Sequence, residues 1–153
     1  AIAAGVFFAV VAFVVKVASI DVTVSEIDPK RLNGRPNPHG HAQVVYVTGP
    51  MFFAAMGRFE EAIHNVNAEA VIFSMRGVPY IDTSGAQMLW EFCKSRKQQG
   101  VGVFFAALQP RVAEVMKRAG IPEIVGEGAF FSNALDAIEA CSGFVDSIDE
   151  KSR

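Results

Sequence analysis

One stretch constrains the fold of this chain more than any other. Residues 71–75 form a run that is apolar apart from Ser74, the turn 82–85 is polar apart from its glycine, and a helical pattern spans 86–98. A nearly continuous apolar run of this length is typical of a strand that is covered on both faces. A strand that turns directly into a helix predicts unpaired backbone N–H groups at the positive end of the helix dipole. Four residues form the turn: Asp82, Thr83, Ser84 and Gly85.

The simplest role for a hydroxyl or carboxylate in this turn is to cap the helix that follows. The same geometry can hold an anion or carry a phosphate, because both are stabilised at a helix N-terminus. These two interpretations of the turn 82–85 remain open from the residues alone.

The order of elements around this stretch predicts the fold class. We expect a strand at 42–48 that pairs with a short hairpin arm at 51–53, then a helix with Phe59 and Ile63 on its inner face. After the helix 86–98 come a buried strand at 101–106, a helix that Pro110 opens and at most a short edge strand at 124–125. Ser132 is the expected N-cap of a last helix.

Alternation of buried strands with amphipathic helices is the signature of an α/β domain with a mostly parallel sheet. The expected hairpin makes the sheet mixed. Function in such sheets tends to lie at the carboxyl ends of the strands, and the turn 82–85 occupies that kind of position.

The first 15 residues differ in composition from the rest of the chain, because none of them has a polar side chain and Lys16 is the first charge. At about 1.5 Å per residue, such a helix covers roughly two-thirds of a bilayer core. It fits the C-terminal part of a transmembrane helix (1–18), a signal peptide without its basic start, or a buried helix. The basic residues that follow fit a cytoplasmic flank, which favours the transmembrane interpretation. We therefore expect the chain, which starts at Ala1, to be a fragment or a processed product.

The other predicted segments are a juxtamembrane linker at 19–41, a globular domain at 42–144 and a flexible tail at 145–153. Residues 22–27 have a brief alternation that can make a short strand. Three prolines and two glycines in residues 29–41 argue against a regular element there.

Composition and spacing argue against several function classes. A net charge of −2 carries no electrostatic footprint for nucleic acid. Cys93 and Cys141 lack metal spacing and are expected to be buried thiols. His39, His41 and His64 are expected to be solvated and not metal ligands. Because there is no catalytic Ser/His/Asp pattern, paired carboxylates or phosphate-binding P-loop in the sequence, we expect neither an enzyme nor a metal site.

Three sequence stretches together resemble the STAS domain (sulphate transporter and anti-sigma factor antagonist). They are residues 49–54 (GPMFFA), residues 78–85 (VPYIDTSG), and Gly120-Ile121 followed by residues 129–131 (AFF). The first stretch resembles the branch fused to SulP-type anion transporters. The apolar start followed by Lys16 is similar to the end of the last transmembrane helix in those transporters.

The resemblance implies a mixed sheet of four or five strands flanked by about four helices, preceded by an apolar, membrane-type helix. It implies a regulatory or assembly domain on the cytoplasmic side of the bacterial inner membrane, attached to a secondary transporter of sulfate, bicarbonate or dicarboxylates. The implied partners are the transporter membrane domain, a second copy in a homodimer, and a regulatory protein or kinase. No cofactor is implied beyond a weaker expectation of nucleotide contact near the turn.

The resemblance also implies a modified residue, since the position of Ser84 matches a serine that is phosphorylated in the free-standing anti-anti-sigma relatives. Ser84 is thus our candidate for phosphorylation or partner docking, together with Asp82, Thr83 and Gly85. A soluble anti-sigma factor antagonist regulated by serine phosphorylation is the alternative function. A plain helix-start hydroxyl is the alternative role for Ser84.

Overall fold

The computed structural model describes residues 1–17, 19–32, 34 and 41–151. Its centre is a five-stranded sheet in which the strands lie side by side in the order of the sequence. β1 pairs antiparallel with β2, and the remaining neighbours pair in parallel. The predicted α/β fold with a mixed sheet is confirmed. The strands are β1 (Asp21–Glu26), β2 (Ala42–Thr48), β3 (Ala70–Gly77), β4 (Gly102–Ala106) and β5 (Phe130–Phe131).

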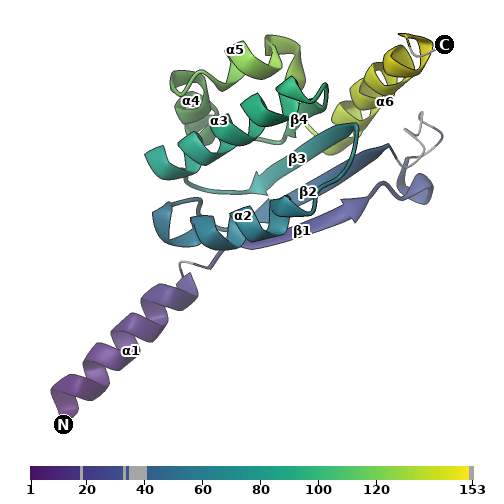
Figure 1. Ribbon diagram of the computed structural model, residues 1–153. Helices are drawn as coiled ribbons and strands as arrows, with labels where there is room; N and C mark the ends of the chain where they lie inside the picture. Colours follow the sequence, from purple (N-terminus) through teal and green to yellow (C-terminus); the bar gives the residue numbers. More distant parts are fainter. Residues whose placement is uncertain (18, 33, 35–40, 152–153) are drawn as a thin grey trace.

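Helices cover both faces of this sheet (Figure 1). One face is covered by α2 (Met56–His64), α3 (Thr83–Gln98), α4 (Pro110–Arg118) and α5 (Ile121–Val125). The other face is covered by α6 (Ala134–Lys151). The helices α2, α3, α4 and α6 agree with the expected number of about four around the sheet, and α5 is an additional short helix.

Strand β3 is the centre of the core because it lies between two layers. Phe73 points to the α2 and α3 side, where its ring lies 5.4 Å from that of Phe105 and 5.3 Å from that of Phe92. Ile72 points to the opposite side and packs in the cluster that includes residues of α6. This explains the nearly continuous apolar run at 71–75, since helices cover both faces of its strand.

The predicted hairpin at 51–53 is wrong. The strand that pairs antiparallel with β2 is β1, which lies in the predicted linker where the brief alternation at 22–27 allowed a short strand. Met51 instead makes an isolated parallel bridge to Ile81, and the chain then enters the 3-10 helix η2 (Phe53–Ala55). Gly49, with a φ of 104°, turns the backbone so that it does not return along β2.

The expected linker 19–41 is thus partly ordered. Besides β1 it contains the 3-10 helix η1 (Pro29–Arg31), which Asp28 caps by accepting a hydrogen bond from the Lys30 N–H at 3.0 Å. Leu32 is buried in the same cluster as residues of α6. The remaining Pro- and Gly-rich part, 35–40, lies outside the described residues.

The C-terminal third differs from expectation in three places. Residues 124–125 belong to α5 and not to an edge strand, because Pro122 fits the first turn of a helix, where its missing N–H is not needed. The edge strand is β5. Asn133, and not Ser132, caps α6, since its Oδ1 accepts a hydrogen bond from the Asp136 N–H at 3.0 Å.

The expected flexible tail 145–153 is helical up to Lys151, where α6 ends. Val145 lies inside the predicted tail but is buried against the sheet, so apolar packing extends α6 past the expected boundary at residue 144. Residues 152–153 lie outside the described part.

The apolar N-terminal segment forms the helix α1 (Ile2–Val17), which stands away from the sheet (Figure 1). Nine of its large apolar side chains are exposed, from Ile2 at 86% to Val11 at 42%. This excludes the interpretation that it is buried in the domain core. Among the described residues, none of the helices combines the length and the apolarity that a membrane crossing requires.

Candidate functional site

The turn 82–85 is held by the carboxylate of Asp82. This residue has an extended backbone and caps α3, with its Oδ1 accepting a hydrogen bond from the Gly85 N–H at 2.8 Å. Its Oδ2 accepts from the Phe53 N–H at 3.1 Å, at the start of η2. One side chain therefore joins two backbone segments that lie 29 positions apart in the sequence. The capping role is confirmed, and Asp82 is the residue that performs it.

Backbone contacts fix the same junction a second time. The Met51 N–H donates to the Tyr80 carbonyl at 2.9 Å, and the Asp82 N–H donates to the Met51 carbonyl at 3.0 Å. Gly85 packs directly against the backbone of Met51, because a Cβ on Gly85 would lie 2.7 Å from the Met51 carbonyl oxygen. A side chain is excluded at that distance, so glycine is required there for close packing and not for an unusual φ.

Thr83 and Ser84 are the two residues of the turn that face solvent, whereas Gly85 is buried and Asp82 is half-buried. Ser84 is therefore accessible from solvent in the folded domain. Two exposed aromatic side chains flank the turn: Phe53 is 73% exposed and Tyr80 is 57% exposed.

The four predicted site residues follow one another in the chain. The structure adds three residues at this junction that the sequence interpretation did not include: Met51, Phe53 and Tyr80. Residues 51 and 53 lie in the GPMFFA stretch, and residue 80 lies two positions before the turn. What the sequence could not reveal is that the two stretches meet, because that contact depends on how the loop after β2 returns to the end of β3.

The other chemically distinctive side chains are structural. Burial raises the pKa of the Cys93 and Cys141 thiols to about 12, so both are protonated and unreactive near neutral pH, as expected of buried thiols. His41 Nδ1 lies 2.9 Å from Glu69 Oε1, and His64 is exposed on α2. His39 lies outside the described residues. Within the described part of the chain, no group of three or more His, Cys, Asp or Glu side chains is placed to hold a metal ion.

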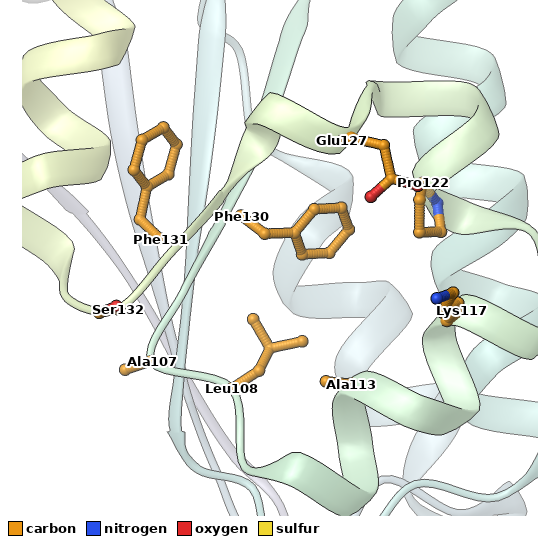
Figure 2. Close-up of a pocket in the computed structure, with 9 residues that line it drawn as sticks. All are labelled: Ala107, Leu108, Ala113, Lys117, Pro122, Glu127, Phe130, Phe131 and Ser132. Carbon is orange, nitrogen blue, oxygen red and sulfur yellow. The ribbon is translucent and has the colours of Figure 1, made fainter.

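A separate open cavity of about 490 Å³ lies beyond the end of β4 (Figure 2). Its walls are mostly apolar, and Lys117 and Glu127 supply the two charged side chains. Ala107 at its edge has a φ of 58°, a left-handed conformation that is uncommon for a residue with a Cβ. None of the predicted site residues lines this cavity, whose lining is Ala107, Leu108, Ala113, Lys117, Pro122, Glu127, Phe130, Phe131 and Ser132.

The chain is an α/β domain with a mixed sheet and a capped turn at the carboxyl end of a buried parallel strand. Residues 35–137 match the family model described as the STAS domain. The chain belongs to the STAS domain family.

Within that family the chain is homologous to the STAS domains of SulP-type sulfate transporters. It is 26% identical over 128 residues to the probable sulfate transporter 4.2 of Arabidopsis thaliana, covering 72% of this chain but only 19% of that protein. It is 29% identical to the SulP transporter STAS domain from Vibrio cholerae, covering 69% of this chain and 84% of that structure with a TM-score of 0.57.

Two more distant structures share the fold. The murine solute carrier 26 family member A9 anion transporter is 19% identical, with a TM-score of 0.69, and the match covers 95% of this chain and 25% of the transporter. An anti-sigma factor antagonist from Mycobacterium paratuberculosis is 18% identical, with a TM-score of 0.62, covering 80% of this chain and 94% of that one. At these identities the likeness concerns the fold alone.

Proposed function

We propose that this chain is the regulatory and assembly domain of a SulP-family secondary anion transporter, attached to the cytoplasmic side of the bacterial inner membrane. The substrates that we propose for the complete transporter are sulfate, bicarbonate or a dicarboxylate. The proposed role is not enzymatic: the domain binds its partners and changes what the membrane part does. The observation that carries the proposal is the homology to SulP STAS domains together with the exposed, rigidly held turn 82–85.

The membrane attachment that we propose is α1, as the C-terminal part (1–18) of a transmembrane helix. Its support is physical. A helix that exposes apolar side chains all round is unstable in water and is stabilised by a lipid or protein environment. A soluble anti-sigma factor antagonist, the alternative function, is supported by the shared fold but leaves the exposed side chains of α1 without an explanation.

The proposed partners are the transporter membrane domain, a second copy of the chain in a homodimer, and a kinase or other regulatory protein. Ser84 is the proposed switch. A phosphate there would add about −1.5 to −2 charges at the N-terminus of α3, where the dipole stabilises them but the Asp82 carboxylate repels them. A partner that docks on the neutral hydroxyl would then meet a hydrated dianion, which costs a few kcal/mol when the contact excludes water.

Contact of this turn with an anion or a nucleotide stays a prediction. The carboxylate of Asp82 already accepts the Gly85 and Phe53 N–H groups, so those two donors are not available to an incoming anion. Only an anion that displaces the carboxylate, or that uses other groups of the turn, fits this arrangement.

The experiment for the proposed switch is a comparison of affinities. The binding of the transporter membrane domain is measured in one detergent for wild type, Ser84→Ala and Ser84→Asp, with Thr83→Ala as the neighbouring exposed control. We expect Ser84→Ala and Thr83→Ala to bind like wild type and Ser84→Asp to bind at least tenfold more weakly, which corresponds to about 1.4 kcal/mol. Equal affinities for all four proteins would end the proposal that Ser84 is a switch.

A further inference from the structure

The point at which α1 joins the sheet is fixed by close packing. Ile20 is only 6% exposed and immediately precedes β1. A Cβ on Gly49 would lie 2.6 Å from the Ser19 carbonyl oxygen, so the backbone just before β1 packs directly against Gly49. Residues 19 and 20 therefore pack against the folded domain.

The same edge of the sheet carries the turn 82–85. Gly49 follows β2, and its N–H donates to the Gly77 carbonyl at the end of β3 at 2.8 Å. Met51, two residues further on, contacts Tyr80 and Asp82 through the backbone. Because β2 and β3 are parallel, their carboxyl ends meet here, and α1 leaves from this edge and not from the opposite one (Figure 1).

Five exposed residues form what we name the strand-end surface: Phe53, Pro79, Tyr80, Thr83 and Ser84. Its aromatic members are held by their backbones, since the Phe53 N–H donates to Asp82 and the Tyr80 carbonyl accepts from Met51. A rigid backbone that presents large aromatic side chains to solvent is typical of a contact surface, because ordering them on contact costs little further entropy.

The distance from α1 to this edge is short. Three residues, 18–20, separate the end of α1 from β1. Three extended residues span at most about 10 Å. Each polar headgroup layer of a bilayer is roughly 5–8 Å thick outside a hydrocarbon core of about 30 Å. With α1 in hydrocarbon, the edge of the sheet beside Gly49 is within reach of the headgroups.

We infer that the strand-end surface faces the bilayer and contacts its lipid headgroup layer. This inference rests on the proposed insertion of α1. Tyrosine is suited to this layer, because its ring sits in the apolar boundary and its hydroxyl stays hydrated, and the Phe53 ring adds an apolar contact. Lys16 in the last turn of α1 and Arg76 near the end of β3 are exposed cations for the lipid phosphates. A phosphate on Ser84 would face anionic headgroups and be repelled by them.

The test uses the complete 153-residue chain in nanodiscs of phosphatidylcholine and phosphatidylglycerol. Single cysteines carrying a fluorophore are introduced by Ser84→Cys and, as a matched control, by Gln98→Cys at the other end of α3. Both positions are exposed, and about 21 Å of helix separates them. The native cysteines are buried and do not compete for the label. A Val10→Cys label reports on the insertion of α1.

Headgroup-attached spin labels should quench the Ser84→Cys probe at least threefold more than the Gln98→Cys probe. Acyl-chain spin labels should quench the Val10→Cys probe. Adding Phe53→Ser and Tyr80→Ser should reduce the quenching of the Ser84→Cys probe and leave that of Val10→Cys unchanged.

Equal quenching at the two ends of α3, with Val10→Cys quenched, would overturn the inferred orientation and leave the proposed membrane attachment standing. An unchanged Ser84→Cys signal in the serine double variant would overturn the aromatic contact. A Val10→Cys probe that acyl-chain labels do not reach would overturn the attachment itself, and the inferred orientation with it.

Discussion

Gly85 offers the sharpest test of how the turn 82–85 is built, because two physical effects predict opposite signs for Gly85→Ala. Gly85 is the third residue of α3. In a helix, alanine is normally favoured over glycine by about 1 kcal/mol. In this structure, however, the added Cβ would lie 2.7 Å from the Met51 carbonyl oxygen and 3.0 Å from Ile81 Cγ1. We predict that the steric effect wins and that Gly85→Ala destabilises the domain.

The magnitude follows from what has to move. The closest atom is a backbone oxygen that accepts the Asp82 N–H, so it cannot move without straining that hydrogen bond. Overpacking of this kind costs about 1–3 kcal/mol, and shifting α3 would also lengthen the charge-assisted bond from the Gly85 N–H to Asp82. Subtracting the helical gain leaves a loss of roughly 0–2 kcal/mol from overpacking, and the weakened bond to Asp82 adds to it, so we expect a net loss of about 1–2 kcal/mol in the free energy of unfolding.

Urea unfolding in one detergent, followed by circular dichroism, measures this difference. Gly143→Ala is the matched control, because Gly143 is also in a helix and a Cβ there would meet nothing within 4 Å. We expect Gly143→Ala to gain about 0.5–1 kcal/mol. If Gly85→Ala unfolds at the same urea midpoint as wild type or at a higher one, the turn is not packed tightly against Met51 and the reasoning fails.

Three further predictions concern the cap, the core and the thiols. Asp82→Ala removes both acceptors of the cap and should lower the free energy of unfolding by about 2–3 kcal/mol, with Asp82→Asn in between, as measured by urea unfolding. Phe73→Ala should cost about 3–5 kcal/mol in the same assay, because Phe73 is fully buried among aromatic rings, whereas Phe53→Ala at the surface should change stability little. Native Cys93 and Cys141 should resist iodoacetamide at pH 8 and react once urea is added. Since folding raises their pKa from 9.0 to about 12, the stability that depends on protonated thiols should be present below pH 9 and fall as the pH rises from 9 to 12.

The fold was predictable where the local pattern and burial agree. The run 71–75 is apolar apart from Ser74 because both faces of β3 are covered, and α3 starts directly after the capping residue Asp82. Predictions failed where a short segment had to choose between partners. Residues 51–53 have the composition of a strand, but β2 already has β1 and β3 as neighbours, so no edge of it remains for a hairpin arm.

For the candidate site, the sequence pointed to Asp82, Thr83, Ser84 and Gly85, because a strand-to-helix turn favours capping residues, and the structure shows that Asp82 is the cap. The roles of Thr83 and Ser84 stay predictions. It could not show that Asp82 also holds the Phe53 N–H, which depends on a contact between segments far apart in the chain. The exposed aromatic pair was missed for a related reason: Phe53 and Tyr80 look like core residues by type, and only the structure shows that their side chains are exposed while their backbones bond to Asp82 and Met51.

The central claim is that the turn 82–85 regulates an anion transporter, and uptake by the complete transporter tests it most directly. Uptake of labelled sulfate, bicarbonate and a dicarboxylate into proteoliposomes is compared for wild type, Ser84→Ala, Ser84→Asp and Gln98→Asp, which adds the same charge at the opposite end of α3. We predict that Ser84→Asp changes the uptake rate of the transported anion at least threefold relative to Ser84→Ala, and that Gln98→Asp behaves like wild type. Equal uptake rates for all four proteins would contradict the claim.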